Sequence, residues 1–144
     1  MFNYDSVYKP YSNTSIKWLR SDTEELYKQH LIEKRSLLEK NNWIDCNFYY
    51  TFNSEGFRCD EFTTDPTIMF LGCSNTLGIG LPAEYTWPTI VANRLNMASA
   101  NLGQAGGAAD TAFRLCLGWI DKIKPKIVIF LQPPGIRWEL VKDN

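Results

Sequence analysis

The segment Thr67-Ile68-Met69-Phe70-Leu71, followed by Gly72-Cys73-Ser74-Asn75-Thr76-Leu77-Gly78-Ile79-Gly80, decides the fold class of this 144-residue chain. A short, nearly continuous apolar run is typical of a strand that is buried on both faces of a parallel sheet. The glycines, serine and asparagine after it indicate a loop at the carboxyl end of that strand. We therefore predict a buried strand over residues 67–71 and a loop over residues 72–80.

Two helices and two further strands are predicted downstream. Thr86 as N-cap and Pro88 in the first turn favour a helix near residues 87–95, and a strand is expected over 97–102. A second helix over 110–124 is expected to bury one apolar face, made of Phe113, Leu117, Ile120 and Ile123. A third strand, rich in Ile and Val, is expected over 126–131. This alternation predicts an α/β domain with a parallel sheet.

The N-terminal part does not continue this alternation of strands and helices. Residues 1–18 are polar and aromatic and are expected to form an irregular arm. Ser21 and Glu24 have the spacing of a capping box, so a helix is predicted over 22–40 with one apolar side buried. Residues 46–52 suit a strand. We expect an N-terminal arm and helix over residues 1–52, attached to an α/β domain over residues 53–144.

Composition restricts the classes of function. A net charge of −1 does not indicate the basic surface that binds nucleic acid or an anionic membrane, so neither partner is expected. The four cysteines form no Cys-x-x-Cys pair, which argues against a metal site and favours reduced, buried thiols; Cys46 and Cys59 could pair in an oxidising compartment. No apolar run approaches the length of a membrane span, and no signal peptide is recognised. We expect a cytoplasmic protein without a cofactor.

Three loops follow the predicted strands, at residues 72–80, 103–108 and 132–137. Because the carboxyl ends of parallel strands meet at one edge of a sheet, these loops are expected to converge there. Ser74 would then expose its hydroxyl to the crevice, with backbone amides pointing at a developing oxyanion. A glycine- and serine-rich loop is equally compatible with a plain turn or with a flavodoxin-like nucleotide binder that cradles a phosphate. The lysine of a P-loop and a Gly-x-Gly-x-x-Gly sequence are both missing.

Four motifs, in this order, resemble those of the SGNH (GDSL-type) hydrolases, a family of serine esterases. The first is similar to an Asn-x-x-Gly-Phe-Arg sequence that precedes the catalytic block in the family, and the second to the Gly-Asp-Ser block followed by Thr-x-Gly-x-Gly. The third is similar to the start of the helix after that block, and the fourth to an Asn-x-Gly loop. Here they read Asn53-Ser54-Glu55-Gly56-Phe57-Arg58, Gly72-Cys73-Ser74-Asn75-Thr76-Leu77-Gly78-Ile79-Gly80, Thr86-Trp87-Pro88 and Asn101-Leu102-Gly103-Gln104-Ala105-Gly106.

The resemblance implies a three-layer α/β/α, flavodoxin-like core with an added N-terminal helical segment. It implies that Ser74 is the nucleophile and that the amides of Ser74 and Gly106 are oxyanion donors. The implied reaction is hydrolysis of a small acyl ester on a carbohydrate or lipid through an acyl-enzyme. Asn75, Gln132 and Arg137 are candidate residues on the substrate side. Arg137, Trp138 and Glu139 either form a cluster there or leave Arg137 paired with Glu139 on a solvated face.

The sequence departs from the family pattern at three places. Cys73 stands where the family has Asp, and Gln132-Pro133 stands where an Asn side chain is the usual further oxyanion donor. The Asp-x-x-His block that supplies the catalytic base is missing, and the only histidine, His30, falls on the predicted N-terminal helix, where we interpret it as structural.

A sheet that ends with the strand at 126–131 has an open apolar edge, which invites pairing with another chain. We therefore expect a truncated or incomplete SGNH core that self-associates through this edge. The alternative to an esterase is a catalytically inactive SGNH-like module that binds carbohydrate or another ligand at the same loops.

Overall fold

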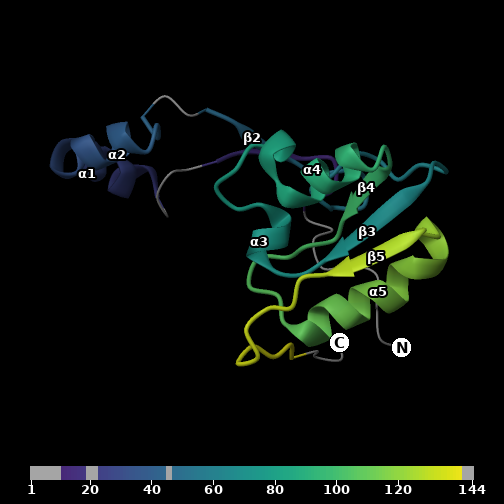
Figure 1. The fold of residues 1–144 in the computed structure, drawn as a ribbon. Coiled ribbons are helices and arrows are strands. Elements are labelled where there is room, and N and C mark those ends of the chain that lie inside the picture. Colours follow the sequence, from purple (N-terminus) through teal and green to yellow (C-terminus); the bar gives the residue numbers. More distant parts are fainter. Residues whose placement is uncertain (1–10, 19–22, 45–46, 141–144) are drawn as a thin grey trace.

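A three-stranded parallel sheet forms the centre of the molecule (Figure 1). Its strands are β3 (Thr67–Leu71), β4 (Ala98–Asn101) and β5 (Ile127–Phe130), in the order β4–β3–β5. The structure is a computed structural model that describes residues 11–18, 23–44 and 47–140. All three predicted strands are confirmed, although β4 and β5 are shorter than expected. The fold is therefore mixed α/β with a parallel sheet.

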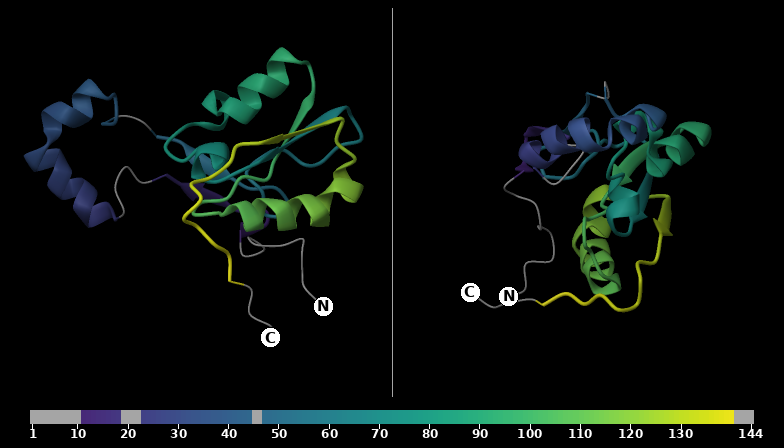
Figure 2. Two further views of the ribbon diagram at one scale, coloured as in Figure 1. Left: turned by 60° about the horizontal axis from the view of Figure 1, so that its bottom comes forward. Right: turned by 90° about the vertical axis from the view of Figure 1, so that its left-hand side faces the viewer.

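Helices pack on both faces of this sheet (Figure 2). Side chains alternate between the faces of a strand, so Met69 and Leu71 contact helix α5 (Ala109–Ile123), whereas Ile68 and Phe70 contact helix α4 (Trp87–Arg94). Both predicted helices are confirmed. Pro88 lies in the first turn of α4, and the short 3₁₀ helix η2 (Ala83–Tyr85) precedes it.

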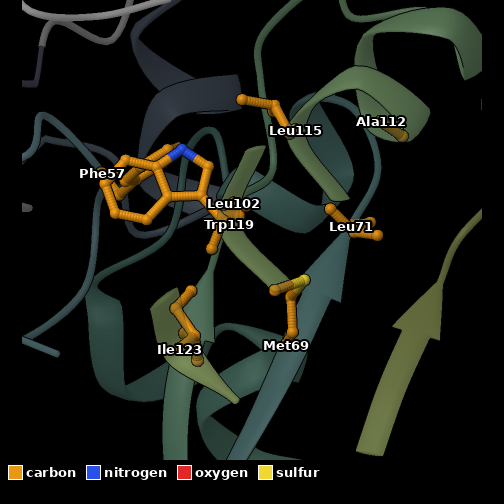
Figure 3. Close-up of a cluster of buried hydrophobic side chains, with 9 residues drawn as sticks. Phe57, Met69, Leu71, Leu102, Ala112, Leu115, Trp119 and Ile123 are labelled. Atoms are coloured by element: carbon orange, nitrogen blue, oxygen red, sulfur yellow. The ribbon is translucent and has the colours of Figure 1, made fainter. Parts of the chain in front are cut away.

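Helix α5 buries a different face from the one predicted. Phe113, Leu117 and Ile120 are 67%, 52% and 38% exposed, whereas the residues that form the core with β3 are Ala112, Leu115, Trp119 and Ile123 (Figure 3). Phe57 meets the Trp119 ring edge-on, with ring centroids 5.1 Å apart. The prediction was confirmed for Ile123 and wrong for the other three residues, because α5 carries two neighbouring apolar stripes and the three-stranded sheet covers only one of them.

The predicted helix at 22–40 is two helices, α1 (Glu24–Glu33) and α2 (Arg35–Lys40), which are interrupted at Lys34 with φ −130° and ψ 26°. Thr23 caps α1, because its Oγ1 accepts a hydrogen bond from the Leu26 amide at 3.1 Å; the predicted cap, Ser21, lies outside the described residues. Leu38 is the only described residue of the two helices that is buried. The predicted buried side is absent from α1 because α1 and α2 lie beside the sheet domain, not against it (Figures 1 and 2).

The N-terminal arm is partly regular. Strand β1 (Ser15–Lys17) pairs antiparallel with β2 (Tyr49–Thr51), so the expected irregular arm is wrong at these residues and the expected strand at 46–52 is shorter. Two bonds continue the pairing toward the motif at residue 53: the Phe52 amide donates to the Thr14 carbonyl at 2.9 Å, and the Asn13 amide donates to the Asn53 carbonyl at 3.0 Å. β1 was missed because its pairing partner lies more than 30 residues away and its three residues are too few to establish a pattern.

Candidate active site at the carboxyl end of the sheet

The loops after the three parallel strands meet, as expected. The short helix α3 (Ser74–Leu77) begins three residues after the end of β3 at Leu71, with Cys73 in the N-cap position. The Gln104 amide, in the loop after β4, donates to the Gly72 carbonyl at 3.1 Å. After β5, the Leu131 amide donates to the Leu71 carbonyl at 2.9 Å. Backbone hydrogen bonds therefore hold the loops that follow β4 and β5 at the end of β3.

The contact between the β4 loop and α3 depends on Gly103. A Cβ at this position would lie 2.5 Å from the Leu77 nitrogen and 2.7 Å from the Thr76 carbonyl carbon, both backbone atoms. The neighbouring Asn101 is buried; its Nδ2 donates to the Thr76 carbonyl at 2.8 Å, and its Oδ1 accepts from the Gly103 amide at 3.0 Å. The Asn101 side chain therefore connects the β4 loop to α3 and has a structural role within the site.

Ser74 is partly buried at the start of α3. Its Oγ lies 4.0 Å from the Sγ of Cys73, which is buried. Burial acts to raise the pKa of the Cys73 thiol, but the Asn75 amide, the Ser74 hydroxyl and the Arg137 guanidinium lower it, and the net pKa lies below its ordinary value. The Ser74 hydroxyl and the Arg137 guanidinium therefore both favour the thiolate form of Cys73.

The other candidate residues come one each from the segments that follow the three parallel strands. Asn75, Gly106 and Gln132 are all exposed, and within the described ranges no hydrogen bond joins Ser74 to Gly106 or Gln132. Gly106 has φ +75°, a left-handed conformation that favours glycine and gives its loop a sharp turn. Its amide is therefore presented by a backbone conformation that a side chain at this position would strain.

His30 lies elsewhere. It is half-buried on α1, with its Nε2 3.4 Å from the Lys34 Nζ. Helix α1 is well separated from α3 in Figure 1 and in the left-hand view of Figure 2. The arrangement leaves the imidazole on the N-terminal helix pair and leaves Ser74 without a neighbouring histidine.

The cysteines of the described segments are single thiols. Cys59, Cys73 and Cys116 are free, and Cys46 lies outside the described residues. Burial raises the pKa of the Cys59 thiol to about 12, which makes it unreactive, in contrast to Cys73. Within the described part of the chain, no three His, Cys, Asp or Glu side chains form a group that could hold a metal ion.

Sequence reasoning used Arg58 as part of a motif but missed its role. Arg58 is buried; its Nη1 donates to the carbonyls of Leu77 and Gly78 at 3.0 and 2.6 Å, and its Nη2 donates to that of Leu81 at 2.6 Å. The guanidinium also lies 3.9 Å from the centroid of the Tyr50 ring. Burial lowers the pKa of Arg58, an effect that Tyr50 and Glu84 partly offset. Arg58 therefore holds the end of α3 and the following turn in place.

A cavity of about 250 Å³ lies beside this arginine, between α4 and β4. Its lining includes Asp60, Glu84 and Thr89, and two buried atoms in its wall, Arg58 Nε and Ser99 Oγ, have no hydrogen-bond partner among the described residues. Its size and two unsatisfied donors suit ordered water. Ser74 is not among its described lining residues.

The segment after β5 is anchored by an ion pair that the sequence did not reveal. Arg114 of α5 donates two hydrogen bonds to the Glu139 carboxylate, from Nε to Oε2 at 2.8 Å and from Nη2 to Oε1 at 2.6 Å. This corrects the expectation that Glu139 would pair with Arg137. Trp138 is 80% exposed and forms no closed cluster with its neighbours. The two partners are 25 residues apart, so no local spacing could have predicted them.

Comparison with known proteins gives no matching family model, no matching curated protein and no matching solved structure. None of the helices within the described residues is long and apolar enough to cross a membrane. The chemistry of the site must therefore be argued from its own residues.

Proposed function

We propose that this chain carries the core of an SGNH-type serine esterase, with Ser74 as the nucleophile. The observation that carries the proposal is the position of Ser74, which is partly exposed, follows the fully buried central strand closely and lies where the loops after β4 and β5 are tied. Ligands of open parallel sheets bind at this end of the strands. Helices α4 and α5 on opposite faces of the sheet support a three-layer, flavodoxin-like core.

The proposed reaction is hydrolysis of a small acyl ester of a carbohydrate or lipid. Ser74 Oγ adds to the ester carbonyl carbon, the alcohol leaves, and water then releases the acid from the acyl-enzyme. The amides of Ser74 and Gly106 are the proposed donors to the oxyanion. A group that accepts the Ser74 proton is also needed, and the chain's one histidine is on α1, apart from α3.

That same separation favours a second candidate, a catalytically inactive SGNH-like module that binds carbohydrate at these loops. A serine hydroxyl without a base is a poor nucleophile at neutral pH. A binding module needs the crevice and its polar groups but needs no base. The two candidates differ in what the loss of the Ser74 hydroxyl does.

The test is hydrolysis of 4-nitrophenyl acetate together with labelling by a fluorophosphonate probe, with the labelled residue located by mass spectrometry. The esterase predicts label on Ser74 and loss of both signals in Ser74→Ala. Ser36→Ala, which changes an exposed serine on α2, is the matched control and keeps both. Label elsewhere, or unchanged hydrolysis in Ser74→Ala, overturns the esterase. Absence of hydrolysis with oligosaccharide binding that survives Ser74→Ala supports the binding module.

A further inference from the structure

The segments after β3 and β5 leave the sheet toward opposite faces. The chain passes from β3 to α4 on one face, whereas Glu139, in the segment after β5, is held by Arg114 of α5 on the other. Ligands of open α/β sheets bind at the carboxyl ends of the strands where the connections change direction in this way. Ser74 lies in the segment after β3, and Arg137 lies in the segment after β5.

An ion pair and a turn fix the position of the segment that contains Arg137. The Arg114 and Glu139 side chains are only 11% and 19% exposed, so their two-bond ion pair is a firm anchor for the segment. The Arg137 amide donates to the Pro134 carbonyl at 3.3 Å and closes a turn. The Arg137 guanidinium is then close enough to hydrogen-bond to the Cys73 thiol, next to Ser74.

Within the described part of the chain, no carboxylate balances the charge of Arg137. Glu139 is engaged by Arg114, and no carboxylate of the described residues lies within ion-pair distance of Arg137. Its Nη1 is buried and has no hydrogen-bond partner in the described part of the chain. The adjacent thiol is only a weak acceptor.

A second donor without an acceptor lies in the neighbouring loop. Gln104 is 2% exposed and its Nε2 has no partner among the described residues, while its backbone amide binds the Gly72 carbonyl. Buried donors without acceptors cost free energy. Anionic oxygens are the acceptors that a guanidinium binds best.

We propose that Arg137 binds a negatively charged group, a carboxylate or a phosphate, of the molecule whose ester faces Ser74. The site then prefers anionic esters to neutral esters of the same shape. The ester part of this ligand rests on the proposed function, whereas the preference for negative charge rests on Arg137 and its surroundings.

The test is a binding titration followed by ¹⁵N-NMR, because binding does not require catalysis. The probes are monomethyl succinate, its uncharged counterpart dimethyl succinate, and methyl phosphate as the phosphate source. We expect the two anions to shift the amide signals of Ser74 and Arg137 saturably, and dimethyl succinate to leave them in place. Arg137→Gln weakens anion binding by about 10–100-fold, the usual loss for a hydrogen bond to a charged group. Arg137→Lys restores part of it, and Arg94→Gln, which changes an exposed arginine of α4, is the matched control.

Equal binding of monomethyl and dimethyl succinate, or unchanged anion binding in Arg137→Gln, overturns the proposal. If Arg137→Gln instead raises the pH at which iodoacetamide alkylates Cys73 and leaves anion binding unchanged, Arg137 is the counter-ion of Cys73 and the proposal is also overturned. Anion binding that depends on Arg137, without any hydrolysis that depends on Ser74, supports this inference while the esterase fails. If only one of the two anions binds, the result identifies whether the charged group is a carboxylate or a phosphate, and it supports the proposal.

Discussion

Strands β3 and β5 are neighbours of similar apolar character with opposite burial. All five residues of β3 are buried, whereas Ile127, Val128 and Phe130 of β5 are 39%, 41% and 46% exposed. β3 has a strand on each side and a helix on each face, while β5 pairs with β3 alone among the described strands. The difference teaches that position in the sheet, more than composition, sets how much a residue contributes to stability.

An apolar groove marks where the cover of β5 is incomplete. It has a volume of about 230 Å³ and lies between Val128 and Phe130 of β5 and Ala112, Phe113 and Cys116 of α5. Phe113 belongs to the exposed stripe of α5. Substitutions on this open side of the sheet should therefore cost less stability than substitutions on the enclosed strand β3.

The largest effect is expected from a matched pair of phenylalanines. Phe70→Ala on β3 removes a fully buried ring that meets Trp87 edge-on, and should lower the free energy of unfolding by about 3–5 kcal/mol. Phe130→Ala on β5 should cost less than about 1 kcal/mol, because the ring is already half in water. Urea denaturation followed by circular dichroism measures both. Equal losses would mean that β5 is buried in solution by a partner.

A matched pair of glycines compares the loops that follow the strands. Gly103→Ala, after β4, drives a methyl group into the backbone of α3 and should cost more than about 2 kcal/mol. Gly135→Ala, after β5, meets no atom within 4 Å and should change stability by less than about 0.5 kcal/mol. The midpoint of thermal unfolding reports the contrast. A tolerated Gly103→Ala would show that the β4 loop does not pack on α3 as described.

Arg58 tests how firmly the turn after β3 is held. Arg58→Met keeps the apolar stem but leaves three carbonyls without their donor, and should cost about 2–3 kcal/mol. Arg35→Met removes an exposed pair with Glu39 on α2 and should cost at most about 0.5 kcal/mol. Limited proteolysis should show earlier cleavage near residues 77–81 in the Arg58 variant alone. A protected turn in that variant would contradict the assigned role.

The smallest effect on stability is expected at the β5 edge. An open apolar strand edge is a site where chains pair, so we expect the protein to self-associate there. Val128→Lys should leave the free energy of unfolding within about 0.5 kcal/mol of its original value and lower the association seen by analytical ultracentrifugation. Lys17→Val, which makes the reverse change on the exposed strand β1, is the control and should not lower association. Association that persists in Val128→Lys would place the contact elsewhere.

The candidate site was predictable as a location but not as a set of contacts. A serine after an apolar run predicts a residue at the end of a strand, and the chain places Ser74 there. The roles of Arg58 and Arg114 were not predictable, because their partners are backbone carbonyls and a carboxylate 19 to 25 residues away. Local spacing carries no information about such pairs, since the intervening strands and helices bring them together.

The sequence by itself determined the order of the three parallel strands and of helices α4 and α5, because hydrophobic period and the chemistry of helix caps and loops act over a few residues. The short helices α3 and η2 were not predicted; the residues of α3 fall in the predicted loop 72–80. Only the tertiary structure decided which stripe of α5 is buried, which strand is enclosed, and which carboxylate pairs with Arg114. These outcomes depend on how many strands are present to cover each face and on which side chains meet across the sheet. Burial and charge pairing are properties of neighbours in space, and those neighbours are set only when the chain has folded.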